Sequence, residues 1–241
     1  MSLEGKTVLI TGAALRIGRS LALAVAQAGG DVILHFGKSR KEAESLQTEI
    51  EVIGRKAFIL QADLADPAQA AALVDNAREY SPLFALVNNA SIFEPAGWAD
   101  TSLDQWNRTL AVNLTAPFLL SQAFARSLEP VGTGRIVNLM DWRALHPRPD
   151  HLAYMISNSG LAALTHSLAV ALAPRIAVNG LALGAVLPPG DGSPANVNLE
   201  KVPARRWAKL EEVGQALIFL LDGPAYITGD VLYVDGGRHL V

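Results

Sequence analysis

The N-terminal segment is the feature that most constrains how this chain folds. Residues 7–18 read TVLITGAALRIG, where a short apolar run is followed by Gly12 and then by Gly18. The apolar run suits a buried strand, and apolar residues at helical spacing over residues 16–28 predict a helix. Such a strand–turn–helix directs free N–H groups and a helix N-terminus at one point, which favours an anion such as phosphate. The segment therefore predicts a dinucleotide-binding turn. The three-glycine G-x-G-x-x-G pattern is absent, however, and ordinary turns also favour glycine.

Strand-like and helix-like segments alternate along the rest of the chain. We expect further strands at residues 31–36, 57–61, 84–87, 135–140, 176–179 and 231–234, and helices at residues 41–53, 67–80, 103–128, 152–173 and 211–221. Pro117 is expected to kink the long helix over residues 103–128. The alternation predicts a single α/β domain over residues 1–241, a Rossmann-type doubly wound parallel sheet of about seven strands with helices on both faces. Ligands are then expected at the carboxyl ends of the strands.

Composition and charge exclude several kinds of function. The net charge of -3 argues against a nucleic-acid partner, because phosphate contacts need a basic face. The chain has no cysteine, which excludes disulfides and thiolate chemistry, and its five histidines show no metal-ligand spacing. The segment MSLEGK has no apolar signal region, and no uninterrupted apolar run approaches the roughly 18 residues of a membrane span. We expect a cytoplasmic protein with a small-molecule substrate and without a metal, a nucleic acid or a membrane as partner.

Three polar residues occur where this fold places a ligand. Asp141 follows the strand at residues 135–140, and Tyr154 lies early in the next helix. Asn158 is one turn further on, so it shares a helix face with Tyr154. This spacing resembles the short-chain dehydrogenase/reductase family. The resemblance covers the whole chain and includes Thr11-Gly12, Asp63, Asn88-Asn89-Ala90, Asn113, Ile227-Thr228-Gly229 and Asp235-Gly236-Gly237.

Several details are similar to the pteridine reductase branch of that family, and the tail GGRHL at residues 236–240 is similar to its bacterial dihydromonapterin reductase type. Arg16 stands where most members have Gly, and Asp141 where most have Ser. The resemblance implies reduction of a pterin or dihydropterin. Phe93 would stack on the flat ring, and Arg16 would donate to a pyrophosphate and to a pterin carbonyl. Asp141 would join Tyr154 in delivering protons.

The cofactor is expected to be NADPH. An NAD site usually has a carboxylate at the end of the second strand, but residues 35–41 contain none and offer Lys38 and Ser39 to a 2′-phosphate. The alternative is a solvated turn that happens to be basic. The resemblance also assigns Asp63 to the adenine amine, and a helix N-cap is the alternative role for that residue.

The resemblance assigns each remaining site residue. Cofactor contacts fall on Gly12, Arg16, Ile17, Gly18, His35, Lys38, Ser39, Asp63, Leu64, Asn89, Ala90, Gly184 and Val186. Substrate contacts fall on Arg16, Ser91 and Phe93, and the catalytic set is Asp141, Tyr154, Asn158 and Asn113, the last in a structural role. A loop over residues 184–206 is expected to cover the substrate, and a homotetramer is expected through the helices at residues 103–128 and 152–173.

Asn158 departs from the family, which has a charged Lys at this position. Asn can hydrogen-bond the ribose but supplies no charge, so Tyr154 would titrate near its ordinary pKa of about 10. Because the neutral phenol is the proton donor, this change favours an obligate reductase. Two alternatives stay open: a reductase of another carbonyl, such as a 3-oxoacyl thioester or a sugar, and an NADP(H)-binding protein with impaired catalysis. His151, Trp142 and Arg143 flank the predicted site. Trp142 is expected to pack, and Arg143 and Arg148 to be solvated, with contact to a folate tail or an acidic neighbour as the alternative for both arginines.

Overall fold

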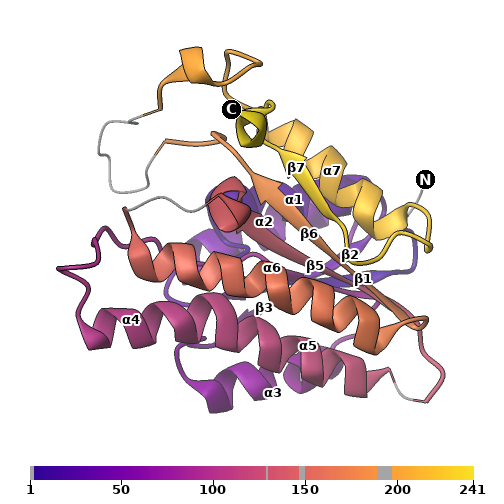
Figure 1. Ribbon diagram of the computed structural model, residues 1–241. Coiled ribbons are helices and arrows are strands. Elements are labelled where there is room, and N and C mark those ends of the chain that lie inside the picture. The colour runs from indigo at the N-terminus through magenta and orange to yellow at the C-terminus, as the bar shows by residue number, and fades with distance from the viewer. Residues whose placement is uncertain (1–2, 129, 147–149, 189–196) are drawn as a thin grey trace.

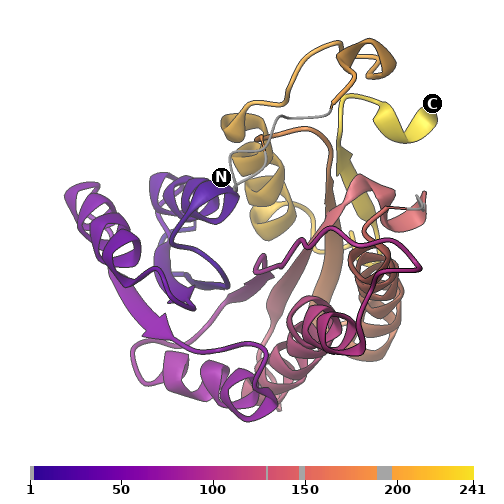
Figure 2. The same cartoon turned by 90° about the vertical axis from the view of Figure 1, so that its left-hand side faces the viewer.

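Seven parallel strands form one sheet in the computed structural model, which describes residues 3–128, 130–146, 150–188 and 197–241. The strands lie in the order β3-β2-β1-β4-β5-β6-β7, and each adjacent pair runs parallel. Helices cover both faces of the sheet (Figures 1 and 2). The predicted Rossmann-type doubly wound fold is confirmed.

Most element boundaries agree with the sequence pattern within a few residues. The strands are β1 (Thr7–Ile10), β2 (Asp31–Phe36), β3 (Ala57–Gln61), β4 (Ala85–Asn88), β5 (Gly134–Asp141), β6 (Ile176–Leu183) and β7 (Val231–Val234). The helices are α1 (Arg16–Gln27), α2 (Arg40–Val52), α3 (Pro67–Arg78), α4 (Leu103–Leu110), α5 (Ala116–Ser127), α6 (Leu152–Leu172) and α7 (Leu210–Asp222). Short helical turns are η1 (Ala111–Thr115), η2 (Trp142–Leu145), η3 (Leu199–Lys201) and η4 (Arg238–Leu240). Strand β6 continues four residues beyond its predicted end at Asn179, because its Gly180–Leu183 segment pairs with β7.

The side chains of β1 show why the strands are apolar throughout. Val8 and Ile10 face one side of the sheet and pack in a core with α1 and α7. Leu9 faces the other side and packs in a second core with α3 and α5. Successive residues of a strand point to opposite faces, so a sheet covered on both sides needs apolar residues at every position.

The long helix predicted over residues 103–128 is interrupted. Helices α4 and α5 are separated by η1, a π-helical turn that contains Asn113, while Pro117 lies in the first turn of α5. The predicted kink at Pro117 was therefore placed a few residues too late. Proline has no N–H to donate to the carbonyl four residues earlier, which is that of Asn113, so the irregular hydrogen bonding falls in the preceding turn.

Helix α6 is long and apolar enough to cross a membrane, with 21 residues and a mean hydropathy of 1.3 in its most apolar window. Serine, asparagine and histidine interrupt the apolar residues of this helix, so its sequence contains no uninterrupted apolar span. In the fold, α6 packs against β5 and β6, as a core helix of an α/β protein does.

Two valines provide a matched test of the packing. Val32 in β2 is fully buried, whereas Val52 at the end of α2 is 82% exposed. We expect Val32→Ala to lower the free energy of unfolding by about 2 kcal/mol, because it removes buried methyl groups and leaves a cavity. Val52→Ala should change it by less than about 0.5 kcal/mol. Urea unfolding of both variants measures the difference, and equal losses would contradict this arrangement of the core.

Candidate active site

The site lies where the strand order reverses, between β1 and β4. Chain connections lead outward in opposite directions from these two neighbours, so a crevice opens at their carboxyl ends. The turns that follow β1, β4, β5 and β6 all lie along this edge of the sheet. Gly12 and Asn89 lie in the turns after β1 and β4, Asp141 ends β5, and Gly184 follows β6.

The turn after β1 is hydrogen-bonded to the turn after β4. The backbone N–H groups of Asn89 and Ala90 donate to the Thr11 hydroxyl at 2.9 and 3.0 Å. The Asn89 side-chain amide donates to the carbonyls of Thr11 and Gly12 at 2.8 and 3.1 Å. Gly12 has φ 62°, and an added Cβ there would lie 3.0 Å from the Cα of Ala90, so this close approach requires glycine.

Gly18 and Ile17 open helix α1 directly behind this turn. A Cβ on Gly18 would overlap the Gly12 carbonyl oxygen, so the glycine allows the helix to begin against the turn. The helix has no side-chain N-cap, and Leu15 at the cap position makes no side-chain hydrogen bond. The backbone N–H groups at the N-terminal end of α1 are therefore available to donate hydrogen bonds to a phosphate.

His35 supports the turn from beneath. Its side chain is 2% exposed; Nδ1 accepts from the Gly12 N–H at 3.1 Å, and Nε2 lies 3.1 Å from the Ala62 carbonyl oxygen. One partner is a donor and the other an acceptor, so the ring must be neutral with its proton on Nε2. Burial lowers the pKa of His35 to about 4. Both ring nitrogens are thus bonded to the protein, and the assignment of His35 to the cofactor site stays a prediction.

Arg16 has a left-handed backbone, with φ 55°. This conformation costs a non-glycine residue roughly 1–3 kcal/mol and explains why glycine suits the position. The Arg16 guanidinium donates to the Pro188 carbonyl at 2.6 Å and so contacts the loop after β6. The loop expected over residues 184–206 is described except for residues 189–196, and its second part contains η3.

The end of β2 has the basic character expected of a 2′-phosphate site. Lys38 is exposed, and Ser39 at the start of α2 makes no side-chain capping bond. Nearby, Asp63 is exposed and its carboxylate accepts only from the Ala65 N–H, at 2.9 Å, among the bonds found for it. Asp66 is the N-cap of α3, so capping that helix is not the role of Asp63. Leu64 is buried beside it.

Asn113 positions the chain that carries Phe93. Its amide accepts from the Ile92 N–H and donates to the Ile92 carbonyl, both at 2.9 Å. It also donates to the Ser157 hydroxyl at 3.2 Å, and that hydroxyl donates to the Tyr154 carbonyl at 2.8 Å. The π turn at Asn113 therefore links the segment after β4 to the first turns of α6.

Three aromatic rings meet beside the expected substrate position. Phe93 is 49% exposed and contacts Tyr154 edge to face, with ring centroids 4.7 Å apart. The His151 ring stacks on Phe93 at 4.1 Å, with an interplanar angle of 13°. Ser91, assigned to the substrate with Phe93, is exposed two residues before it. The sequence placed His151 beside the site, just before the predicted helix, but gave no sign of its stacking on Phe93.

The Asp141 carboxylate is bonded to the Arg143 guanidinium. Arg143 donates from Nε to Oδ1 at 3.0 Å and from Nη2 to Oδ2 at 3.1 Å, and its Nη1 lies 3.3 Å from Asp150. The expectation of a solvated Arg143 was wrong, because its side chain is only 16% exposed and η2 folds it back over the end of β5. Trp142 is buried, and Arg148 lies outside the described residues.

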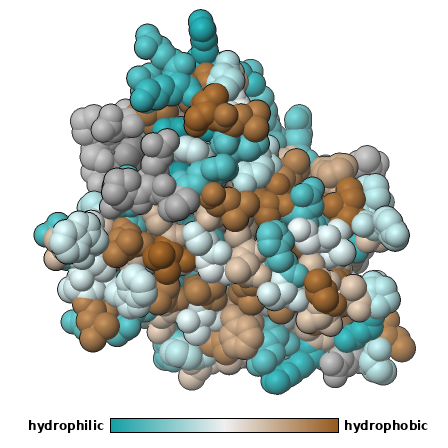
Figure 3. All heavy atoms as spheres, viewed as in Figure 1, coloured by the Kyte–Doolittle hydropathy of each residue, from teal (hydrophilic) through white to brown (hydrophobic). Residues whose placement is uncertain are grey.

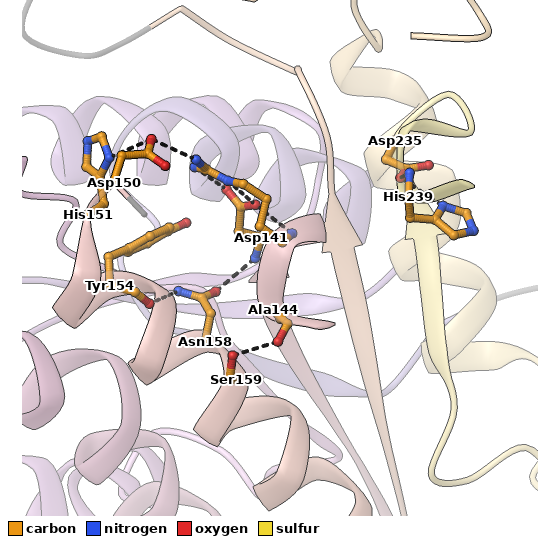
Figure 4. A network of polar contacts seen from close by, with 10 residues as sticks. Asp141, Ala144, Asp150, His151, Tyr154, Asn158, Ser159, Asp235 and His239 are labelled. Atoms are coloured by element: carbon orange, nitrogen blue, oxygen red, sulfur yellow. Dashed lines mark hydrogen bonds and ion pairs between the residues drawn. The ribbon is translucent and has the colours of Figure 1, made fainter. Parts of the chain in front are cut away.

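Asn158 joins the end of β5 to α6. Its Oδ1 accepts from the Asp141 N–H at 2.8 Å, and its Nδ2 donates to the Tyr154 carbonyl at 2.9 Å. Figure 4 shows the phenol oxygen of Tyr154 pointing toward Asp141, above the Asn158 amide. Burial first, and then the charge of Asp141, raise the pKa of Tyr154 far above its ordinary value, against opposing effects of Arg143 and Asn158. The expected titration near 10 is corrected upward.

The loop after β6 begins at a tight contact. The Gly184 N–H donates to the Val234 carbonyl at 3.0 Å, and an added Cβ would lie 2.6 Å from the Cα of Asp235. Val186 is buried two residues later. Within the ranges that the structure describes, no group of three or more His, Asp or Glu residues is placed to hold a metal.

Known proteins share this architecture along the full chain. The family described as enoyl-(acyl carrier protein) reductase matches residues 12–239. A "short-chain type dehydrogenase/reductase" of Picea abies is 31% identical, with 98% of this chain and 93% of the relative covered. The chain belongs to the short-chain dehydrogenase/reductase family. An L-rhamnose 1-dehydrogenase (NAD(P)(+)) of Sphingomonas sp. is a member 33% identical, with 99% of this chain and 98% of the relative covered.

A solved structure of the same family has the same fold. It is FolM alternative dihydrofolate reductase 1 from Brucella canis complexed with NADP, with a TM-score of 0.92 and 33% identity, covering 100% of this chain and 97% of that one. The L-rhamnose dehydrogenase and the dihydrofolate reductase are equally similar to this chain, at 33% identity. Similarity therefore identifies the family of this chain but not its substrate.

The buried histidine predicts a pH dependence of stability. With a pKa of about 4 when folded and 6.5 when unfolded, His35 stays neutral in the fold while the unfolded chain takes up a proton. Stability should therefore fall by about 3 kcal/mol between pH 6.5 and pH 4 from this group. We expect His35→Gln to be less stable than the natural chain at pH 7 and to lose less on acidification. Urea unfolding at several pH values tests this, with the exposed His166→Gln as control; parallel pH curves for all three proteins would contradict it.

Proposed function

We propose that this short-chain dehydrogenase/reductase is an NADPH-dependent reductase of a pterin or dihydropterin. The observation that carries the proposal is the exposed Phe93 ring set 4.7 Å from Tyr154, whose phenol points toward the Asp141 carboxylate (Figure 4). A flat, electron-poor heterocycle stacks well on an aromatic ring, and its N–H groups match a carboxylate acceptor. The similar FolM alternative dihydrofolate reductase supports the same substrate class.

The general activity, whatever the substrate, is that of an NADP-dependent oxidoreductase, as the family and the NADP complexes of similar structures indicate. The chain has residues that fit this cofactor. The glycine-lined turn at Gly12 and the uncapped start of α1 suit a pyrophosphate, and Lys38 and Ser39 suit a 2′-phosphate. When bound, NADPH supplies the hydride that reduces a C=N bond at its carbon.

Tyr154 is the proton donor in this mechanism. Its raised pKa keeps the phenol neutral, so it can donate a proton to the ring nitrogen as the hydride reaches carbon. Arg143 and Asn158 act to lower the pKa of Tyr154, so they stabilise the phenolate that is left when the proton is donated. Asp141 assists by accepting hydrogen bonds beside the phenol. Asn113, through Ile92, holds the segment that presents Phe93.

A homotetramer is part of the proposal. Several apolar side chains are exposed on α4, α5 and α6, among them Leu103 (71%), Phe118 (41%), Ile156 (44%) and Val170 (83%). Figure 3 shows hydrophobic residues, in brown, exposed on the face of the molecule that these helices form. Large exposed apolar groups on neighbouring helices suit contact with further copies of the chain. Cytoplasmic localisation stays a prediction.

Two other functions compete with pterin reduction. The similar L-rhamnose 1-dehydrogenase favours a sugar or another carbonyl substrate. The uncharged Asn158 favours an NADP(H)-binding protein with impaired catalysis, because both ends of its amide are bonded to the protein. Replacing Asn158 by Lys separates the last case: a large gain of activity from an inactive protein would favour impaired catalysis.

The proposal predicts a selective effect at Tyr154. NADPH consumption should occur with dihydrobiopterin, dihydromonapterin or dihydrofolate, and Tyr154→Phe should lower kcat by about 10²- to 10⁴-fold while NADPH affinity stays unchanged. Because the pKa of Tyr154 is raised, the donor form persists and kcat should show no alkaline decline below about pH 10. Tight NADPH binding without turnover of any pterin would overturn the proposal.

A second prediction concerns cofactor choice. Lys38→Glu should weaken NADPH binding by about tenfold and leave NADH binding within about twofold, because the new carboxylate repels only the 2′-phosphate. Lys41→Glu, at the second residue of α2, is the matched control and should change both affinities little. Fluorescence titration with each nucleotide measures the ratio. Equal weakening for NADPH and NADH in the Lys38 variant would place the 2′-phosphate elsewhere.

A further inference from the structure

We propose that Arg143 is a positioning residue that holds Asp141 as a hydrogen-bond acceptor, so that Tyr154 alone donates the proton. Three donors of Arg143 meet the Asp141 carboxylate: its backbone N–H at 2.8 Å and Nε at 3.0 Å on Oδ1, and Nη2 at 3.1 Å on Oδ2. Both side chains are 16% exposed. The inference rests on the proposed reductase function, in which Tyr154 donates the proton and Asp141 accepts hydrogen bonds.

The fork of the guanidinium fixes what Asp141 can do. A carboxylate paired through both oxygens is an anion, which accepts hydrogen bonds and has no proton to give. Oδ1 already accepts two N–H groups and Oδ2 accepts one, so the remaining acceptor capacity of the carboxylate lies toward the Tyr154 phenol, which also bonds to Asp141. The arrangement favours a substrate that presents an N–H group here, as an amino or lactam group of a pterin does. A simple ketone offers no such donor.

Arg143 also sets the charge around the phenol. The charged groups that act on the Tyr154 phenol are Asp141 from β5 and Arg143 from η2, whereas Asp150, just before α6, pairs with Arg143 and His151. Asn158, one turn along α6, contributes an uncharged amide. Arg143 is the cation of this group, and it opposes the effect of Asp141 on the phenol. Although burial favours loss of its proton, the bond to Asp141 raises the pKa of Arg143, so it remains charged.

The outer contact of Arg143 supplies a matched control. Asp150 lies 3.3 Å from Nη1 and its side chain is 53% exposed, so this pair is partly solvated. An exposed pair contributes little, whereas the inner pair sets the orientation of Asp141. Asp150→Asn therefore removes the outer ion pair of Arg143 and leaves its bonds to Asp141 in place.

The experiment compares Arg143→Gln, Arg143→Lys, Arg143→Ala and Asp150→Asn in steady-state NADPH consumption. We expect Arg143→Gln to lower kcat by about 10- to 100-fold with the KM for NADPH within about twofold, since a misdirected Asp141 misplaces the substrate. Arg143→Lys should recover part of the loss, and added guanidinium should stimulate Arg143→Ala but not the natural chain. Asp150→Asn should stay within about twofold. Activity of Arg143→Gln within twofold of the natural chain, or a loss that neither lysine nor guanidinium recovers, would overturn the inference.

A second readout needs no turnover, so it separates this inference from the proposed function. Tyrosine labelled with ¹³C at Cζ reports hydrogen bonding at each of the four phenols, and the signal of Tyr154 is the one lost in Tyr154→Phe. If Arg143 acts through Asp141, this signal should move in Arg143→Gln and in Asp141→Asn, and should stay in place in Asp150→Asn. An unmoved signal in Arg143→Gln would overturn the positioning role. Absence of turnover in the natural chain, with the expected NMR shifts, would reject only the reductase.

Discussion

The hydrogen bonds between the turn after β1 and the turn after β4 are the interaction on which the site depends. Thr11 and Asn89 join two turns whose strands are neighbours only because the sheet order reverses between them. Gly12 allows the approach, and the neutral ring of His35 holds the same turn from below. A parallel sheet can therefore present one rigid anion-binding edge without a third glycine in the motif.

The catalytic side of the crevice is organised by charge rather than by a single strong base. One cation, Arg143, lies between the carboxylates of Asp141 and Asp150, and the neutral amide of Asn158 ties the same strand end to α6. Burial of Tyr154, and after it the charge of Asp141, raises the pKa of the phenol and keeps it protonated. That balance suits a protein that gives a proton during reduction, and it is poorly suited to taking one from an alcohol.

Much of the fold could be predicted from the sequence, because buried parallel strands and amphipathic helices leave clear periodic patterns. The grouping of Asp141, Tyr154 and Asn158 also followed from strand ends and helix spacing. The π turn at Asn113 was missed, since proline marks a defect in hydrogen bonding but not the turn that absorbs it. The burial of Arg143 was not predicted, for a related reason. Its burial depends on how η2 folds back on β5, and no periodicity records that contact.

Transfer of deuterium from NADPH labelled at nicotinamide C4 would show whether this chain reduces a pterin. We expect the natural chain to place the label on a ring carbon of a dihydropterin, as mass spectrometry of the product would show, and Tyr154→Phe to bind the nucleotide equally well yet transfer almost none. Tight binding of labelled NADPH, with no label in any pterin product of the natural chain, would contradict the account.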